Sequence, residues 1–265
     1  MNIYRQELRM SVRSAIYWTL GMLLTLLFFM LMFPAFSQDV AVINQIMSQF
    51  PQEIIKALGL SSLDLSTILG FYGYVFMFIL LMAGIYALKT GISVLSEEIR
   101  AKTADFMVSK PVSRADIVTA KIASVLTLLV VQTIVYLFGA LIITRTVGGQ
   151  YFDKSLFILM NMSMLGVELF FAGLGFLLAV IIKKIKTVLP LALGIVFGFW
   201  IMQMLNQSLE DPALAYFTPF AYFDVGKIIE TGRYETVYLI CELVLIAVFT
   251  ALTYIIYQHK DMPSV

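Results

Sequence analysis

The chain has 265 residues, of which 60% are hydrophobic and only 13% are charged. Soluble domains are about 45–50% apolar, so this composition excludes an ordinary soluble protein and indicates one membrane domain over 1–265. The net charge of +1 points to no class of partner. A single cysteine, Cys241, and a single histidine, His259, exclude an intramolecular disulfide and argue against a metal centre built on Cys or His ligands.

Six apolar runs reach the length of about 20 residues that a membrane-spanning helix needs. We read them as helices, because they are too long and continuous for the strands of a membrane barrel. The fold class is therefore expected to be all-α and polytopic. The predicted spans are 16–36, 68–94, 117–143, 156–182, 188–206 and 236–257.

The N-terminus has the layout of a secretory signal peptide. Arg5, Arg9 and Arg13 precede an apolar run, and "PAFS" then resembles a cleavage site. The apolar run is longer than the roughly 7–15 residues of a signal sequence core. We therefore expect an uncleaved first span.

Lysine and arginine residues are unevenly divided between the two sides of these spans. Because basic residues concentrate on the cytoplasmic side, the richer side is predicted to be cytoplasmic, together with both termini and segment 95–114. That side receives Arg5, Arg9, Arg13, Arg100, Lys102, Lys110, Arg114, Lys121, Lys183, Lys184, Lys186 and Lys260. The other side receives Lys56, Arg145, Lys154, Lys227 and Arg233.

Two loops on the opposite side contain more than a short connection needs. In 37–67, apolar residues recur at helical spacing up to Pro51, and "QEIIKALG" then predicts a second short helix ending at Gly59. The loop 207–235 contains "LAYFTPFAYFD", whose aromatic residues favour the membrane interface. A re-entrant hairpin and a plain aromatic belt both explain this composition.

Segment 95–114 has the features of a short helix, a sharp turn and a newly capped helix. The residues that signal these starts and stops are Ser96, Glu97, Glu98, Pro111, Ser113 and Asp116. Phe106 and Val112 add apolar groups among the charges, which suits a docking surface for another protein. A polar connector between two spans is the simpler alternative.

The stretch "EEIRAKTADFMVSKPVSRADIVTAKI" resembles the cytoplasmic coupling segment of ABC-2 type permeases, the membrane subunits of bacterial ABC exporters. "YRQELRMSVRS" likewise resembles the amphipathic helix that lies on the cytoplasmic surface in that family, here 1–15. Lys102 stands where many relatives carry glycine, and the layout matches over essentially the whole chain. The coupling pattern maps onto Glu97, Glu98, Thr103, Asp105, Phe106, Ser109, Pro111, Val112, Ser113, Arg114, Ile117 and Lys121.

The resemblance implies a non-catalytic permease subunit of an ATP-driven exporter in the bacterial plasma membrane. A second permease, identical or a paralogue, would pair with it, and a cytoplasmic ATP-binding subunit would dock on 95–114. The sequence has no G-x-x-x-x-G-K-[ST] loop, so ATP and Mg are expected on that partner and no cofactor on this chain. Membrane lipid is the other expected partner, and nucleic acid is not expected.

Two acidic residues and two glycines inside the spans are further candidates. Glu168 and Glu242 are expected to face protein or water, because a charge inside the membrane is costly. They either line a path for cargo or form hydrogen bonds between helices. Gly194 and Gly198 form a G-x-x-x-G pattern, which permits close helix packing within one subunit or between two.

Two other function classes compete with the exporter. An intramembrane enzyme would need a paired Asp, an H-E-x-x-H or an Asp-rich site, and the sequence has none. A secondary transporter could couple to protons through Glu168, but it does not require segment 95–114. For an exporter, the apolar interior suits amphipathic or hydrophobic cargo such as a peptide, toxin or antimicrobial. Exporters of phenol-soluble modulins are one relation that fits.

Overall fold

The computed structural model describes residues 3–38, 45, 48–101, 113–148, 151–182 and 185–259, with the backbone alone at 36, 38 and 97–101. Every regular element in these ranges is a helix, and six helices are long and apolar enough to cross a membrane. The all-α, six-span prediction is therefore confirmed. The six are α1 (Ile3–Met30), α5 (Ile68–Ala101), α7 (Arg114–Gly148), α8 (Lys154–Ile181), α9 (Val188–Leu209) and α13 (Thr236–His259).

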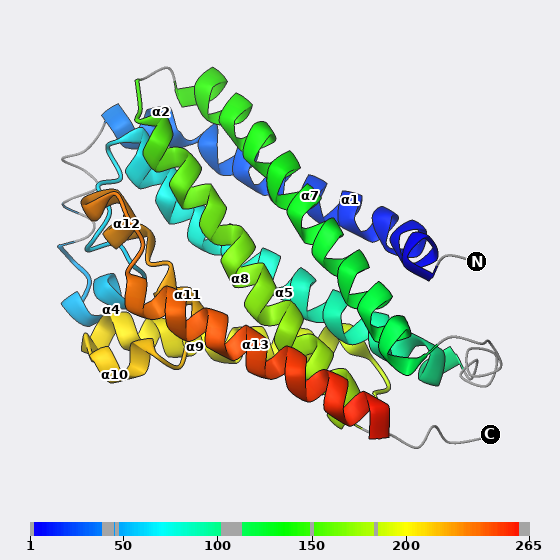
Figure 1. Ribbon diagram of the computed structural model, residues 1–265. Helices are drawn as coiled ribbons and strands as arrows, with labels where there is room; N and C mark the ends of the chain where they lie inside the picture. The colour runs from blue at the N-terminus through cyan, green and yellow to red at the C-terminus, as the bar shows by residue number, and fades with distance from the viewer. Residues whose placement is uncertain are drawn as a thin grey trace.

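The six long helices run side by side, and the short helices gather at one end of the bundle (Figure 1). We call this end the loop end. The opposite end carries the described chain ends Ile3 and His259, together with Ala101 and Arg114 (Figure 1). We call it the basic end. The short helices are α2 (Phe33–Gln38), α4 (Gln52–Ala57), α10 (Pro212–Ala215), α11 (Pro219–Tyr222) and α12 (Val225–Thr231).

Helix α1 begins near the start of the chain and continues without a break into the first span. The segment 1–15 is therefore helical from Ile3 and joined to the span, and its position on the membrane surface stays a prediction. The first candidate span continues to Ala35, close to the expected end at 36, and a turn at 31–32 within it separates α1 from α2. Pro34 explains this interruption, because proline has no N–H to donate to the preceding turn.

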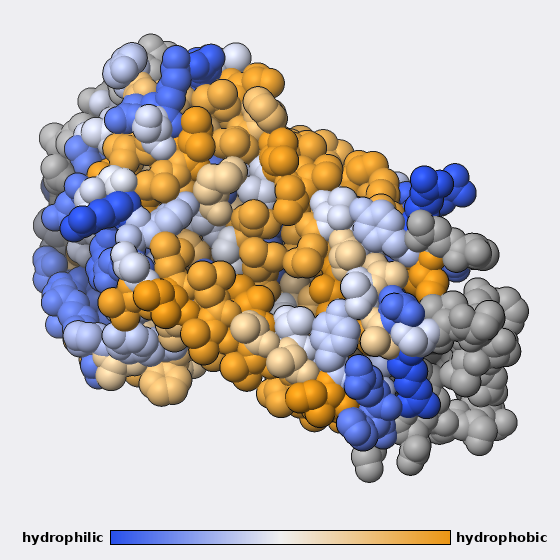
Figure 2. All heavy atoms as spheres, in the orientation of Figure 1, coloured by the Kyte–Doolittle hydropathy of each residue, from blue (hydrophilic) through white to orange (hydrophobic). Residues whose placement is uncertain are grey.

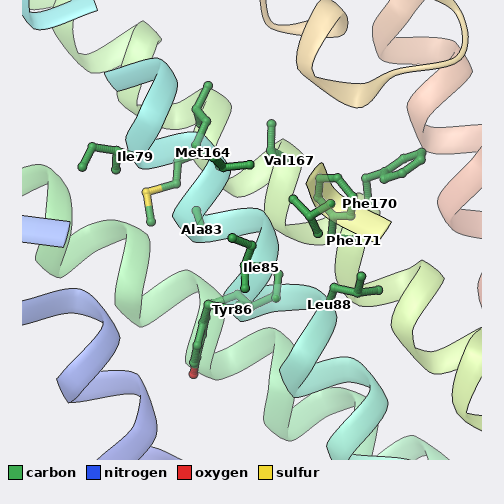
Figure 3. Packing of buried hydrophobic residues seen from close by; sticks show 14 of the residues in the cluster. Ile79, Ala83, Ile85, Tyr86, Leu88, Met164, Val167, Phe170 and Phe171 are labelled. Atoms are coloured by element: carbon green, nitrogen blue, oxygen red, sulfur yellow. The ribbon is translucent and has the colours of Figure 1, made fainter. Parts of the chain in front are cut away.

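Helices α5 and α8 form the centre of the bundle. Figure 3 shows Ile79, Ala83 and Leu88 of α5 beside Met164, Val167 and Phe171 of α8. Glycines allow the two backbones to approach: a Cβ added at Gly175 would lie 2.8 Å from the carbonyl oxygen of Leu88. Small residues at such crossings permit the close packing on which helix association in a membrane depends.

The outer faces of α1, α7, α9 and α13 expose large apolar side chains. Figure 2 shows a broad hydrophobic band that separates a polar surface at the loop end from one at the basic end. Leu20 on α1, Val131 on α7, Ile201 on α9 and Leu243 on α13 are each at least half exposed. Such a band is what a multi-pass membrane protein presents to lipid.

The aromatic loop 207–235 folds into α10, α11 and α12 at the loop end. Phe220 is buried and packs its ring against Phe171 of α8 and Trp200 of α9, with centroid distances of 5.4 and 5.2 Å. Phe217, by contrast, is largely exposed. Part of this motif therefore belongs to the protein core and part remains available to the membrane interface.

Candidate coupling site at the basic end

The predicted coupling segment lies between the two longest helices. α5 has 34 residues and α7 has 35. At 1.5 Å per residue each is about 50 Å long, whereas the hydrocarbon core of a bilayer is about 30 Å thick. Both helices are thus longer than the apolar core requires, and the described ends Ala101 and Arg114 lie at the basic end (Figure 1).

Most of the predicted coupling residues lie outside the described part of the chain. Helix α5 includes the backbone of Glu97 and Glu98, and the structure says nothing of their side chains. Their roles stay predictions, as do those of the residues in 102–112, namely Thr103, Asp105, Phe106, Pro111 and Val112.

Ser113 caps the start of α7, as the S-x-x-D pattern predicts. Its Oγ accepts the backbone N–H of Asp116 at 3.1 Å and donates to Asp116 Oδ2 at 2.6 Å. The cap satisfies a backbone donor that has no partner within the helix, and it places a carboxylate at the positive end of the helix dipole. The end of the coupling segment is therefore followed at once by a rigid helix.

Arg114 connects the start of α7 to the end of α13. Its Nη1 donates to the backbone oxygen of Gln258 at 3.1 Å, so a cation meets the negative end of the α13 dipole. One turn further along, the hydroxyls of Thr119 and Tyr254 lie 2.8 Å apart. Arg114 thus has a bond within the subunit, beside its predicted role toward the ATP-binding partner.

A buried ion pair joins three helices next to the same segment. Nζ of Lys121 on α7 lies 2.8 Å from Oε1 of Glu7 on α1, and it donates to the backbone oxygen of Val94 on α5 at 2.6 Å. The side chains of Lys121 and Glu7 are 1% and 7% exposed. Such a pair is stable only while both charges stay together, because a lone buried charge is strongly unfavourable.

This ion pair is not predicted from the sequence, where Lys121 belongs to the coupling motif and to the basic residues of the cytoplasmic side. The available signal was that a lysine inside an apolar run needs a partner. Glu7 is the only acidic residue before Asp39, and this makes it the natural candidate within the N-terminal helix.

Further polar contacts fix α1 against its neighbours. Lys89 Nζ on α5 donates to Ser14 Oγ at 2.8 Å, and the hydroxyls of Tyr4 and Thr127 lie 2.9 Å apart. Arg5, by contrast, lies on the exposed face of α1. The basic half of α1 therefore has a polar inner face and a cationic outer face.

Glu168 lies fully buried between α7 and α8. Its Oε1 accepts Gln132 Nε2 at 3.1 Å and its Oε2 accepts Thr133 Oγ1 at 2.9 Å. Both carboxylate oxygens are thus held by neutral donors. This arrangement matches the structural alternative of a hydrogen bond between helices, and a role in a cargo path stays a prediction.

Glu242 on α13 is 3% exposed, and its Oε1 has no hydrogen-bond partner among the described residues. It faces protein rather than lipid, as expected for an acid in a span. Its role in a cargo path also stays a prediction.

Gly194 and Gly198 lie on an open face of α9. A Cβ added at either position would meet no described heavy atom within 4 Å. In the described part of the chain, neither glycine serves close packing within the subunit. Packing between subunits is the alternative that remains.

A polar pocket of about 330 Å³ opens at the loop end. Lys56 on α4 and Glu210 at the end of α9 form an ion pair of 2.6 Å beside it. Asp224 is engaged as the cap of α12 through Lys227 N. Its lining residues include Lys56, Ser61, Ser62, Asn206, Gln207, Glu210, Asp211, Asp224, Lys227 and Tyr238. In the described ranges no three His, Cys, Asp or Glu residues are grouped so that they could hold a metal ion.

Comparison with known proteins agrees with this architecture. The model of the ABC-2 family transporter proteins matches residues 1–262, almost the entire chain. No curated protein matches it. With six membrane-spanning helices and this match, the chain belongs to the ABC-2 family of transporter proteins, as a multi-pass permease subunit of an ABC exporter in the cell membrane.

Proposed function

We propose that this permease exports amphipathic or hydrophobic cargo, and that ATP hydrolysis on a separate subunit drives it. The observation that carries the proposal is the length of α5 and α7. Helices of about 50 Å extend well past the bilayer core and present segment 95–114 where a soluble protein can reach it. The excess of basic residues at this end supports its cytoplasmic placement.

The partner supplies the nucleotide chemistry. The chain has no phosphate-binding glycine loop, so ATP and Mg bind to the cytoplasmic subunit. Closure of that subunit moves the coupling segment, and the rigid helices on both sides carry the movement into the bundle. A second permease completes the transporter through the open face of α9 around Gly194 and Gly198.

The cargo class rests on the character of the membrane-spanning region. The interior offers a few polar groups, including Glu168 and Glu242, within a largely apolar core. The described loops at the opposite end form short helices beside a polar pocket of about 330 Å³. Such a path suits a peptide toxin or an amphiphilic antimicrobial better than a large hydrophilic polymer.

The first experiment is to purify the tagged chain from its host in mild detergent and identify the proteins that accompany it. We expect a stoichiometric subunit with a Walker motif, which Phe106→Asp releases while the permease stays folded. Lys56→Ala, at the loop end, is the control and should retain the partner. A stable permease without any ATPase would reject the proposal and favour a transporter coupled to protons through Glu168.

A further inference from the structure

The buried ion pair of Lys121 and Glu7 links α1 to the two helices that flank the coupling segment. We propose that Lys121 is a positioning residue that makes the basic half of α1 move together with the ends of α5 and α7. This rests on the proposed function only in that the ATP-binding partner supplies the movement.

The position of Lys121 suits this role. It lies seven residues after Arg114, the first residue of α7, and Val94 lies seven residues before Ala101, the last residue of α5. Val94 thus directly precedes segment 95–114 on α5, and Lys121 lies about 10 Å beyond its last residue, Arg114, along α7. Because Nζ binds the Val94 oxygen as well as Glu7, α1 is joined to both flanks at the same depth.

Helix α1 has no covalent connection to the coupling segment at this end. The chain leaves α1 at the loop end and returns through α5, so movement at the basic end reaches α1 only through side-chain contacts. The other polar contacts, Lys89 with Ser14 and Tyr4 with Thr127, are less buried. The charged contact of Lys121 and Glu7 is the most buried of the three, with side chains 1% and 7% exposed.

The outer face of α1 is free to follow. Tyr17, Leu24 and Phe28 are each more than half exposed, so lipid rather than protein covers them within the subunit, whereas Ile16 and Leu20 line a groove against α7. Movement of α1 therefore displaces lipid and breaks no described protein contact on that face. The ion pair at Glu7 is therefore sufficient to make this half of α1 follow α7.

The test compares α1 and α7 in the intact transporter. The permease, with its ATPase partner, is placed in lipid nanodiscs in a Cys241→Ser background, with one bimane label at Leu24→Cys on α1 or at Phe138→Cys on α7. Both positions are well exposed, at 56% and 61%, and neither lines the groove between the two helices. The emission shift on trapping with ATP and vanadate reports the movement of each helix.

The test variant is the double change Glu7→Gln with Lys121→Met, which removes both charges of the pair together. We expect the parent to shift at both labels, whereas the double variant shifts at α7 and loses the shift at α1. The control Lys227→Met breaks an ion pair at the loop end and should leave both shifts intact.

The outcomes separate the two proposals. An α1 shift that the double variant retains in full overturns the role of Lys121, as does a parent that shifts only at α7. A parent that has no ATPase partner, or that shifts at neither label, contradicts the proposed function instead. If the double variant fails to fold, Lys121→Arg, which keeps the charge, must retain the α1 shift, and its loss there would also overturn the inference.

Discussion

Thr133 on α7 donates its hydroxyl to Oε2 of Glu168 on α8 at 2.9 Å, and this bond holds an acidic residue at the centre of the protein. Gln132, the preceding residue of α7, donates to the other carboxylate oxygen. Two adjacent residues on one helix thus hold both oxygens of an acid on the next. The Glu168 side chain is thus held in one orientation by two identified hydrogen bonds. Variants that change these bonds or the acid itself can therefore distinguish a structural role of Glu168 from a role in transport.

Thr133→Val should destabilise the permease by about 1–3 kcal/mol, because it keeps the shape of the side chain and leaves a buried carboxylate oxygen without its donor. The measurement is thermal unfolding in detergent. Thr146→Val is the matched control, since the Thr146 hydroxyl is exposed and bonds only to the backbone of its own helix. Equal stability of the two variants would show that the Thr133 bond contributes nothing.

Glu168→Gln should fold as well as the parent. Oε1 of Gln132 has no hydrogen-bond partner among the described residues, so the Gln132 amide can turn and its oxygen can accept a hydrogen bond from the new amide N–H, while Thr133 still donates to the new oxygen. Unfolding temperature and export are measured together. Normal stability with normal export assigns Glu168 a structural role, and normal stability with lost export assigns it to the cargo path.

The sequence predicts the helices well and the contacts between them poorly. Each span is a long apolar run, a local property, and the S-x-x-D cap of Ser113 is local too. The ion pair of Glu7 and Lys121 joins residues 114 positions apart, and only the packing of α1 against α7 brings them together. The role of Gly175 likewise depends on where α5 crosses α8, a relationship that no single helix contains.

Lys227 and Glu235 give the loop end a weak dependence on pH. The hydrogen bond from Lys227 Nζ to Glu235 Oε1, 2.7 Å long, raises the pKa of Lys227 above its usual 10.5. Because the pKa of Lys227 is higher in the folded state, its ion pair stabilises the fold fully below pH 10.5, the usual pKa of lysine. This stabilisation is lost as the pH rises through the pKa of the folded state.

Lys227→Met should therefore lower stability slightly at pH 8, by less than about 1 kcal/mol since the pair is exposed, and the difference from the parent should shrink above pH 10.5. Thermal unfolding of both proteins across this range checks it. A difference that grows with pH would contradict the assignment.

Gly175→Ala should destabilise the permease strongly. The added Cβ would lie 2.8 Å from the Leu88 oxygen and 3.0 Å from the Ile92 nitrogen, and these are backbone atoms that move only if α5 moves. Overpacking of this kind costs about 1–3 kcal/mol. Gly173→Ala, whose Cβ would meet only Phe249 at 3.6 Å, is the control on the same helix and should be tolerated. A tolerated Gly175→Ala would mean that α5 and α8 are less closely packed than the structure shows.

Gly198→Leu should leave the single subunit folded and break the pairing of two permeases. No described atom lies within 4 Å of a Cβ at this position, so the larger side chain creates no clash within the subunit, and leucine favours a helix over glycine by up to about 1 kcal/mol. Close approach of a second α9 would be blocked, since such crossings depend on small residues. The mass of the complex in nanodiscs measures the pairing, and unfolding temperature measures the fold. A variant that stays folded and still pairs would place the partner permease on a different face of the bundle.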